Sequence, residues 1–218
     1  MSDCVELKGM IVRTSPVKEY DKRVVILTGE SGRITAFARG ARRQGSKLLG
    51  TTEPFCFGTF KLFPGRDAYT VADCSITRFF EELRSDYDAY AYATYFLEIA
   101  EYYTKENLEA YDELNLIYAS LLALISGRFD KSFIRSVYEI RSLVIAGEFP
   151  GLPDNSTCRD TVVYAVDRIA SSPLESLYSF GLTGEALKEL VYVSRHLFDR
   201  ICGHSFKSLS MIDSELPA

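Results

Sequence analysis

Residues 23–39 read Arg-Val-Val-Ile-Leu-Thr-Gly-Glu-Ser-Gly-Arg-Ile-Thr-Ala-Phe-Ala-Arg. Two runs of strand-forming character flank the short polar segment Gly29-Glu30-Ser31-Gly32, and the glycines at its two ends suit a tight turn. The stretch therefore predicts two antiparallel strands, residues 23–28 and 33–39, joined as a β-hairpin. This hairpin decides how the surrounding N-terminal sequence is interpreted.

Similar strand patterns lie on both sides of the hairpin. They predict further strands over residues 9–14, 54–63 and 68–80, the last two joined by a turn at 64–67. Several of the five strands carry apolar residues on both faces, as strands do when a sheet curls on itself and is also covered from outside. Residues 1–80 are therefore predicted to form a five-stranded barrel of the OB type.

Helical periodicity replaces the strand pattern after residue 81. Apolar and aromatic residues recur there at spacings of three and four, the period of an amphipathic helix. Glycines stand where several of these helices are expected to end. The predicted fold class is α+β, with the barrel packed with a C-terminal all-α helical domain, residues 81–218. The first helical pattern runs through Tyr92, Tyr95, Phe96, Ile99 and Tyr103. Further helices are expected over residues 107–126, 130–146, 159–171 and 183–202.

Length and composition are typical of a folded protein in a reducing compartment. The chain has 218 residues, of which 47% are hydrophobic, enough for a sizeable core. No run approaches the roughly 18 apolar residues of a membrane helix, and residues 1–6 lack the basic and apolar regions of a secretory signal. The five cysteines are odd in number and form no close pair, which favours reduced thiols. We expect a cytoplasmic protein with no membrane-embedded part.

Charge divides the chain into two unlike parts. Residues 1–80 contain 13 Lys and Arg against 8 Asp and Glu, a net +5, whereas residues 81–218 contain 12 against 22, a net −10. Much of the positive excess lies in the glycine-punctuated segment 39–50, directly after a predicted strand. Such a local reversal of charge in an acidic chain indicates a polyanionic partner, and nucleic acid is the leading candidate.

The basic segment has the chemistry of a phosphate-binding loop. A guanidinium offers a fork of donors and an ammonium a point charge, on a backbone that glycine leaves free to follow phosphates. On an OB barrel, strands 2 and 3 and the loops 1-2 and 4-5 usually form the binding face. Tyr20, Phe37 and Tyr69 are candidates to stack on bases, although Phe37 is favoured as a core residue. The candidate DNA-binding residues are Arg39, Arg42, Arg43 and Lys47 in the segment, with Arg13, Lys18, Lys22, Arg23, Arg33 and Arg66 on the predicted strands and turns.

Four segments resemble the RecO family of bacterial recombination and repair proteins. They are residues 9–14, 29–34, 38–48 and 204–209, and the third is the most specific, with Ala38-Arg39-Gly40-Ala41-Arg42-Arg43 followed by Ser46-Lys47-Leu48. The resemblance runs through nearly the whole chain. It implies an N-terminal OB-fold, a helical C-terminal part, binding of single- and double-stranded DNA, annealing of complementary strands and association with the nucleoid. It also implies three partners: RecR, the C-terminal tail of the single-strand binding protein and, indirectly, RecA, which the mediator helps to load.

One departure from the family concerns a metal. Many members carry a four-cysteine zinc module after the helix expected to end here near residue 146, but this chain has only Cys158 in that region. A structural zinc needs four protein ligands, and Cys202, His196 and His204 lack ligand-like spacing. We therefore expect no metal and no other cofactor, and interpret residues 150–160 as a degenerate, metal-free region.

Docking of an acidic, apolar protein tail would need an apolar pocket with a basic rim. Partly exposed side chains of the tyrosine stripe 87–103 could line such a groove, although packing is their favoured role. The sequence leaves the choice of rim open. Its candidates are Arg135, Arg141, Arg195 and Arg200, all on predicted helices.

Catalysis is not expected. The sequence shows no P-loop, Ser/His/Asp set or paired-carboxylate motif, and its two histidines leave little equipment for acid–base chemistry. Glu81-Glu82 and Asp86 with Asp88 could hold Mg²⁺ in a nuclease, but near helix starts acidic residues more often complement the helix dipole. A recombination mediator is favoured. An RNA-binding OB-fold protein and a protein-docking module without DNA binding remain the alternatives.

Overall fold

The structure is a computed structural model that describes residues 4–152 and 158–213. The chain divides into two compact units. Unit 1 comprises Met1–Glu81 with Ala100–Leu114, and unit 2 comprises Glu82–Ile99 with Asn115–Ala218. The short segment that joins two long helices thus belongs with the N-terminal unit, a grouping that the sequence pattern did not suggest.

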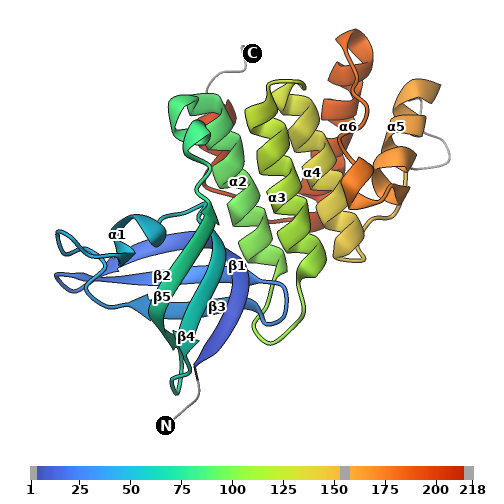
Figure 1. Cartoon of the computed structure of the whole chain (residues 1–218). Coiled ribbons are helices and arrows are strands. Elements are labelled where there is room, and N and C mark those ends of the chain that lie inside the picture. The colour runs from blue at the N-terminus through green and yellow to red at the C-terminus, as the bar shows by residue number, and fades with distance from the viewer. Residues whose placement is uncertain (1–3, 153–157, 214–218) are drawn as a thin grey trace. The chain divides into compact units, whose positions relative to one another are not determined.

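Unit 1 is built on a closed five-stranded barrel with the strand order β1-β2-β3-β5-β4 (Figure 1). All neighbouring strands are antiparallel except β3 and β5, which pair in parallel through Ala36 with Tyr69 and Phe37 with Thr70. The predicted OB-type barrel and the α+β class are confirmed. The strands are β1 Val5–Val17, β2 Asp21–Thr28, β3 Gly32–Ala38, β4 Phe57–Phe63 and β5 Tyr69–Arg78, and a four-residue helix, α1 Leu48–Thr51, precedes β4.

The barrel interior follows from the alternation of side chains along each strand. Val24, Ile26 and Ile34 point inward and join a buried cluster with Phe60 and other apolar residues from all five strands. Val25 and Leu27, which alternate with them on β2, are buried too. The double-sided burial explains why the hairpin sequence is nearly continuous in apolar residues rather than strictly alternating.

The helical elements reproduce the predicted ranges within a few residues, with one exception. The helix expected from residue 107 begins at residue 111, because the backbone before it bonds to the hairpin instead of to itself. Three short elements, η1, η2 and α7, were not predicted. The observed elements are η1 Glu81–Ser85, α2 Tyr87–Tyr103, α3 Tyr111–Ser126, α4 Lys131–Ile145, α5 Asp160–Ser171, η2 Leu174–Ser176, α6 Gly184–Cys202 and α7 Leu209–Asp213.

Helix α4 forms the centre of unit 2. All of its residues from Phe133 to Ile140 are buried, so the helix is enclosed by its neighbours on every side. The ring of Tyr138 stacks on Phe96 of α2 with centroids 4.1 Å apart. Asp130 caps the start of α4 by accepting the backbone N–H of Ser132 at 2.8 Å. Gly203, with φ of +59°, ends α6 in the left-handed conformation expected of a C-terminal glycine.

A buried ionic network lies inside unit 2. Arg135 Nε donates to Glu139 Oε1 at 2.7 Å, and the hydroxyl of Tyr95 donates to the same oxygen at 2.9 Å. Burial raises the pKa of the Glu139 carboxyl, while Arg135 and Tyr95 act in the opposite direction. Arg135 is therefore a component of the core.

Residues 104–110, here called the strap, lie along the β2–β3 hairpin within unit 1. The backbone N–H of Ala110 donates to Gly29 O at 2.8 Å, and that of Asn107 donates to Ser31 O at 3.0 Å. Arg33 N–H donates in return to Lys105 O at 3.2 Å. These bonds satisfy the backbone of both the turn and the strap, which fixes the end of the hairpin opposite to the basic segment.

We predict that Gly32→Ala destabilises unit 1 more than Gly45→Ala does. Both glycines have positive φ, +62° and +78°, so each alanine costs about 1–2 kcal/mol in backbone strain. Only at residue 32 would the new Cβ overlap the strap, at the carbonyl oxygens of Lys105 and Leu108, whereas nothing lies within 4 Å at residue 45. The free energy of unfolding, measured with urea, should fall by about 2–5 kcal/mol for Gly32→Ala. Equal effects at the two positions would contradict the role of the strap.

Candidate nucleic-acid interface

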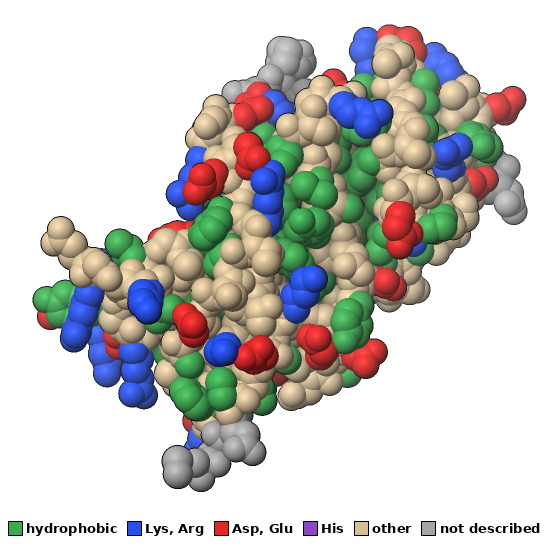
Figure 2. Space-filling model, viewed as in Figure 1, with side chains coloured by type: hydrophobic (Ala, Val, Ile, Leu, Met, Phe, Trp, Pro, Cys, Tyr) green, Lys and Arg blue, Asp and Glu red, His purple; other side chains and the backbone are tan. Residues whose placement is uncertain are grey.

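Two loops at one end of the barrel form a strongly positive surface, here called the basic head. It consists of the β1–β2 turn, residues 18–20, and the β3–α1 loop, residues 39–47, which together contain five cations and one acid, Glu19, for a net +4. Figure 2 shows Lys and Arg side chains gathered at this end of the barrel. The cations are all exposed: Lys18, Arg39, Arg42, Arg43 and Lys47.

Hydrogen bonds join the two loops into one structure. The backbone N–H of Arg42 donates to Tyr20 O at 2.9 Å, and its Nη1 donates to Glu19 O at 3.1 Å. The carboxylate of Asp21 accepts the backbone N–H of Gly40 at 2.8 Å, and Gly40 has φ of +65°. The backbones of the two loops are therefore fixed relative to each other, which lowers the cost of ordering the loops when a polyanion binds.

Lys22 supports the basic head from inside. Its side chain is buried, with 6% of the residue exposed. Its Nζ donates to Glu53 Oε1 at 2.6 Å, to Thr52 Oγ1 at 3.3 Å and to Leu49 O at 3.2 Å. These bonds tie β2 to the segment after the basic loop. Lys22 is therefore not among the residues that we propose to contact DNA.

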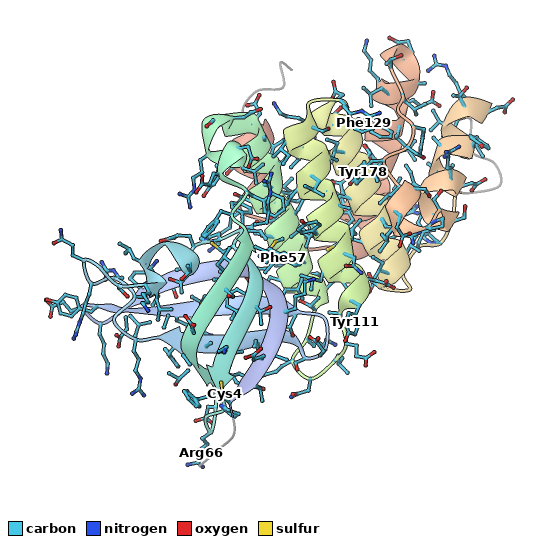
Figure 3. All side chains as sticks on the ribbon, in the orientation of Figure 1. Cys4, Phe57, Arg66, Tyr111, Phe129 and Tyr178 are labelled. Atoms are coloured by element: carbon cyan, nitrogen blue, oxygen red, sulfur yellow. The ribbon has the colours of Figure 1, made fainter. Side chains whose placement is uncertain are left out.

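Other predicted cations lie outside the basic head. Arg13 Nη2 is 2.8 Å from Glu101 Oε1, and Arg33 Nη1 donates to Glu101 O at 2.8 Å, so the charge of both is partly offset. Arg23 is exposed on β2. Figure 3 places Arg66 at the tip of the β4–β5 turn near Cys4, well separated from the β1–β2 turn and α1. The structure thus divides the ten predicted cations into five at the head, one in the interior and four elsewhere on unit 1.

Aromatic side chains accompany the cations. Tyr20 is 41% exposed, and the guanidinium carbon of Arg43 lies 5.1 Å from the centre of its ring. Phe37 is 37% exposed on β3, opposite Arg23 in the ladder, so the preference for a core position was wrong. Its neighbours Ala36 and Ala38 face the core instead. Tyr69 is half-buried and packs against the barrel core.

The four arginines proposed for a docking rim do not surround one pocket. Arg135 is buried in the Glu139 network, and Arg141 Nη1 donates to the carbonyls of Ile169 and Ala170. Arg195 Nε lies 3.9 Å from Asp199, and Arg200 is exposed near the end of α6. Arg135 and Arg141 therefore have structural roles within unit 2, and we do not propose them as rim residues of a dock.

A hollow of about 430 Å³ in unit 2 has the apolar lining that the docking hypothesis requires, with one arginine and one aspartate among its lining residues. It lies between the α3–α4 turn and the start of α6, a region that sequence reasoning did not single out. Arg128 is exposed at its edge, with its guanidinium 5.7 Å from the centre of the Phe129 ring. Asp130 also lines it but caps α4. The remaining lining residues are Phe129, Phe133, Gly181, Leu182, Thr183, Gly184 and Leu187.

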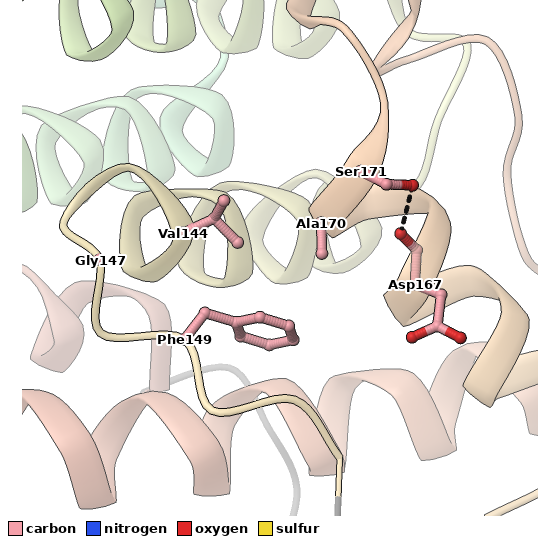
Figure 4. Close-up of a pocket in the computed structure, with 6 residues that line it drawn as sticks. All are labelled: Val144, Gly147, Phe149, Asp167, Ala170 and Ser171. Carbon is pink, nitrogen blue, oxygen red and sulfur yellow. Dashed lines mark hydrogen bonds between the residues drawn. The ribbon is translucent and has the colours of Figure 1, made fainter.

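A second hollow, of about 520 Å³, lies where α4 ends and α5 passes (Figure 4). Val144, Phe149 and Ala170 give it apolar walls, and the hydroxyl of Ser171 donates to Asp167 O at 2.8 Å. Its lining has one carboxylate and neither thiol nor imidazole, so it lacks the ligands of a zinc site.

Metal ligands do not cluster in the part of the chain that the structure describes. Over residues 4–152 and 158–213, no three His, Cys, Asp or Glu side chains come together as a possible metal site. Burial raises the pKa of Cys74 to about 11, which opposes formation of the thiolate that a metal would bind. The degenerate region predicted at 150–160 falls partly on residues 153–157, which lie outside the described residues.

The acidic residues near the start of α2 have structural roles. The backbone N–H of Ala89 and the ammonium of Lys131 hold the pKa of Asp86 below its usual value. Lys131 Nζ is 3.0 Å from Asp86 and 3.7 Å from Asp88. These contacts join the start of α2 to α4 and offset part of the negative charge that would attract Mg²⁺.

No helix in the described residues is both long and apolar enough to cross a membrane.

The chain is similar to proteins of one family along most of its length. The family model "Recombination protein O N terminal" matches residues 1–80, and "Recombination protein O C terminal" matches residues 84–163. The DNA repair protein RecO of Acetivibrio thermocellus is 27% identical over 230 residues, covering 90% of this chain and 92% of that protein. The protein of the same name from Clostridium perfringens is 27% identical over 238 residues, covering 95% and 97%. That of Alkaliphilus metalliredigens is 32% identical over 157 residues, covering 72% of this chain and 64% of its own length.

We predict that Lys22→Met lowers stability while Lys47→Met does not. Removing the Lys22 ammonium leaves the Glu53 carboxylate and the Leu49 carbonyl without their partner; Glu53 is 37% exposed, so the loss should be about 1–3 kcal/mol. Lys47 is exposed and should change the free energy of unfolding by less than about 0.5 kcal/mol. Thermal unfolding of both variants checks this. Unchanged stability in Lys22→Met would remove its role as the support of the basic head.

Proposed function

Since the chain belongs to the recombination protein O (RecO) family, whose relatives are DNA repair proteins, we propose that it is a non-enzymatic mediator of DNA repair and recombination. In this role it binds single- and double-stranded DNA and anneals complementary strands. It acts in the cytoplasm, at the nucleoid. The observation that carries the proposal is the basic head, five exposed cations on two hydrogen-bonded loops of an OB-type barrel.

The geometry of the basic head suits the DNA backbone better than it suits base edges. Its loops present guanidinium and ammonium groups on short turns, and such groups bind phosphates whatever the sequence. Five contacts at about 0.7 counterions each predict that log K for single strands falls with log salt at a slope of about −3 to −4. Affinity without sequence preference is what a repair mediator requires, because damage occurs at any sequence.

Annealing follows from the same charges. Two complementary strands repel each other through their phosphates, and a net +4 surface that binds both backbones lowers this repulsion while leaving base edges free to pair. The step breaks no covalent bond and needs no nucleotide hydrolysis. The role of the barrel is to hold the cations at fixed positions.

Protein partners complete the proposed role. We propose that the chain works with RecR and with the single-strand binding protein, and through them promotes loading of RecA onto coated single strands. The hollow edged by Arg128 is the candidate dock for the acidic, apolar tail of the single-strand binding protein. Its Phe129, Phe133 and Leu187 side chains supply the apolar surface. Arg128 and the N-terminal end of α6 supply positive potential for the acidic groups of the tail.

The double variant Arg42→Glu, Arg43→Glu should lose DNA binding without losing the fold. Both side chains are exposed, and reversing them turns the net +4 of the basic head into 0. Affinity for a labelled single strand, measured by fluorescence anisotropy, should fall by about 10- to 100-fold at low salt, with a salt slope shallower by more than one unit. Annealing of complementary oligonucleotides should slow in parallel.

The matched control for this variant is Lys8→Glu, Lys61→Glu, which reverses two exposed charges elsewhere on the barrel that are not among the predicted DNA contacts. It changes the net charge by the same amount and should reduce affinity far less. Equal losses in the two double variants would show a diffuse electrostatic effect and contradict the assignment to the basic head. Stronger binding of structured RNA than of single-stranded DNA would favour the RNA-binding alternative, and no binding of either would favour a protein-docking module.

The docking proposal predicts that Arg128→Glu weakens binding of the isolated tail peptide by about tenfold, because the reversed charge repels the acidic tail. Arg200→Glu, an exposed reversal on α6 that does not line the hollow, is the control and should leave peptide affinity within about twofold. Titration of a fluorescent peptide measures both. A loss confined to Arg200→Glu would move the dock to the other end of α6.

A further inference from the structure

Tyr20 is held more firmly than an exposed residue at the tip of a turn usually is. Its carbonyl oxygen accepts the backbone N–H of Arg42, and its ring lies under the guanidinium of Arg43. Both contacts come from the neighbouring loop of the basic head. The residue nevertheless remains 41% exposed, so an aromatic side chain that is held from the neighbouring loop is partly open to solvent beside Arg43.

A rigid, exposed ring next to phosphate-binding groups suits one kind of ligand. Nucleic-acid bases stack on aromatic side chains whatever their identity, since each base has a π-face, and an adjacent arginine strengthens the stack through its charge. A simple anion would use the cations and leave the ring unused. An apolar peptide would use the ring but gain nothing from the arginines.

The ring also distinguishes single strands from duplexes. Inside a double helix each base face is covered by the next base pair, so an aromatic side chain cannot reach it without unstacking the helix. In a single strand the bases can turn outward and stack on protein. Phosphate contacts are available in both forms of DNA and are denser in the duplex, so they give no preference for a single strand.

We propose that Tyr20, held by Arg43, is the stacking position for an unpaired base through which the basic head prefers single-stranded over double-stranded DNA. This proposal rests on the proposed function, because it needs the head to bind DNA. It assigns different tasks to adjacent residues: the cations of the head hold the backbone of either form, and Tyr20 adds affinity only where a base is free.

The test compares Tyr20→Leu with the wild-type chain on three DNA ligands, and each ligand is compared only between the two proteins because the duplex has the higher charge density. These are a single strand, the same strand with abasic sites in place of bases, and a duplex whose ends are closed by base-free linkers, so that it exposes neither an unpaired base nor a terminal base pair. Tyr20→Leu should bind the single strand about 5- to 30-fold more weakly, the size of one lost stack. It should bind the abasic strand and the closed duplex as the wild type does. Tyr20→Phe, which keeps the ring, should restore the preference.

Phe63→Leu is the control, since Phe63 is a comparably exposed aromatic residue at the end of β4. It should change none of the three affinities. An equal loss on all three ligands in Tyr20→Leu would mean that the ring only positions Arg43 and would overturn the proposal. Absence of binding by the wild-type chain to any of them would instead overturn the proposed function.

A direct readout is possible because the chain contains no tryptophan. In Tyr20→Trp the new indole is the sole tryptophan, and a base stacked on it should quench its fluorescence. The single strand should quench it and the abasic strand should not. Tyr164→Trp, at an exposed position on α5 in unit 2, gives the background level. Equal quenching at the two positions would contradict stacking at residue 20.

Discussion

The buried ammonium of Lys22 is the contact on which the positive end of the barrel depends. Five exposed cations on two short loops repel one another, and a loop that is free to move would spread them apart. Lys22 limits this movement from the barrel interior. Its Nζ donates hydrogen bonds to Leu49, Thr52 and Glu53, which follow directly after the basic loop. At the surface, the carbonyls of the β1–β2 turn accept hydrogen bonds from Arg42 of the basic loop. The loop backbones that carry the cations are thus positioned by the fold before any polyanion binds.

The strand and helix pattern could be predicted from the sequence because periodicity is a local property. The hairpin around Gly29 and Gly32 was correctly identified by its flanking apolar runs and turn glycines, and the barrel followed from three more runs of the same kind. The strap could not be predicted in this way. Residues 104–110 carry no period of their own, and their conformation is set by backbone bonds to a hairpin about 75 residues earlier in the chain.

The candidate site was predicted in outline but not in its division of roles. Lys22 and Lys47 look equivalent in a list of basic residues, and only the fold shows that one is buried and the other exposed. The prediction for Phe37 was wrong because its neighbours Ala36 and Ala38 are also apolar. The sequence alone does not reveal whether residue 37 or residues 36 and 38 face the core. Arg135 offered a usable signal that was overlooked. It stands four residues before Glu139 in a helix that is apolar on most sides, a pattern that favours a buried ion pair.

Because the whole chain is acidic, attraction of a polyanion depends on the local arrangement of positive charge. With a net charge of −5, the protein as a whole does not attract DNA at distances beyond the screening length. At physiological salt that length is about 8 Å, so a phosphate at the basic head is influenced mainly by the cations within one or two side-chain lengths. The proposed binding of DNA then depends on how closely the loops hold those cations together, and hence on the hydrogen bonds of Arg42, Asp21 and Lys22. Its strength would follow from loop geometry more than from the composition of the chain.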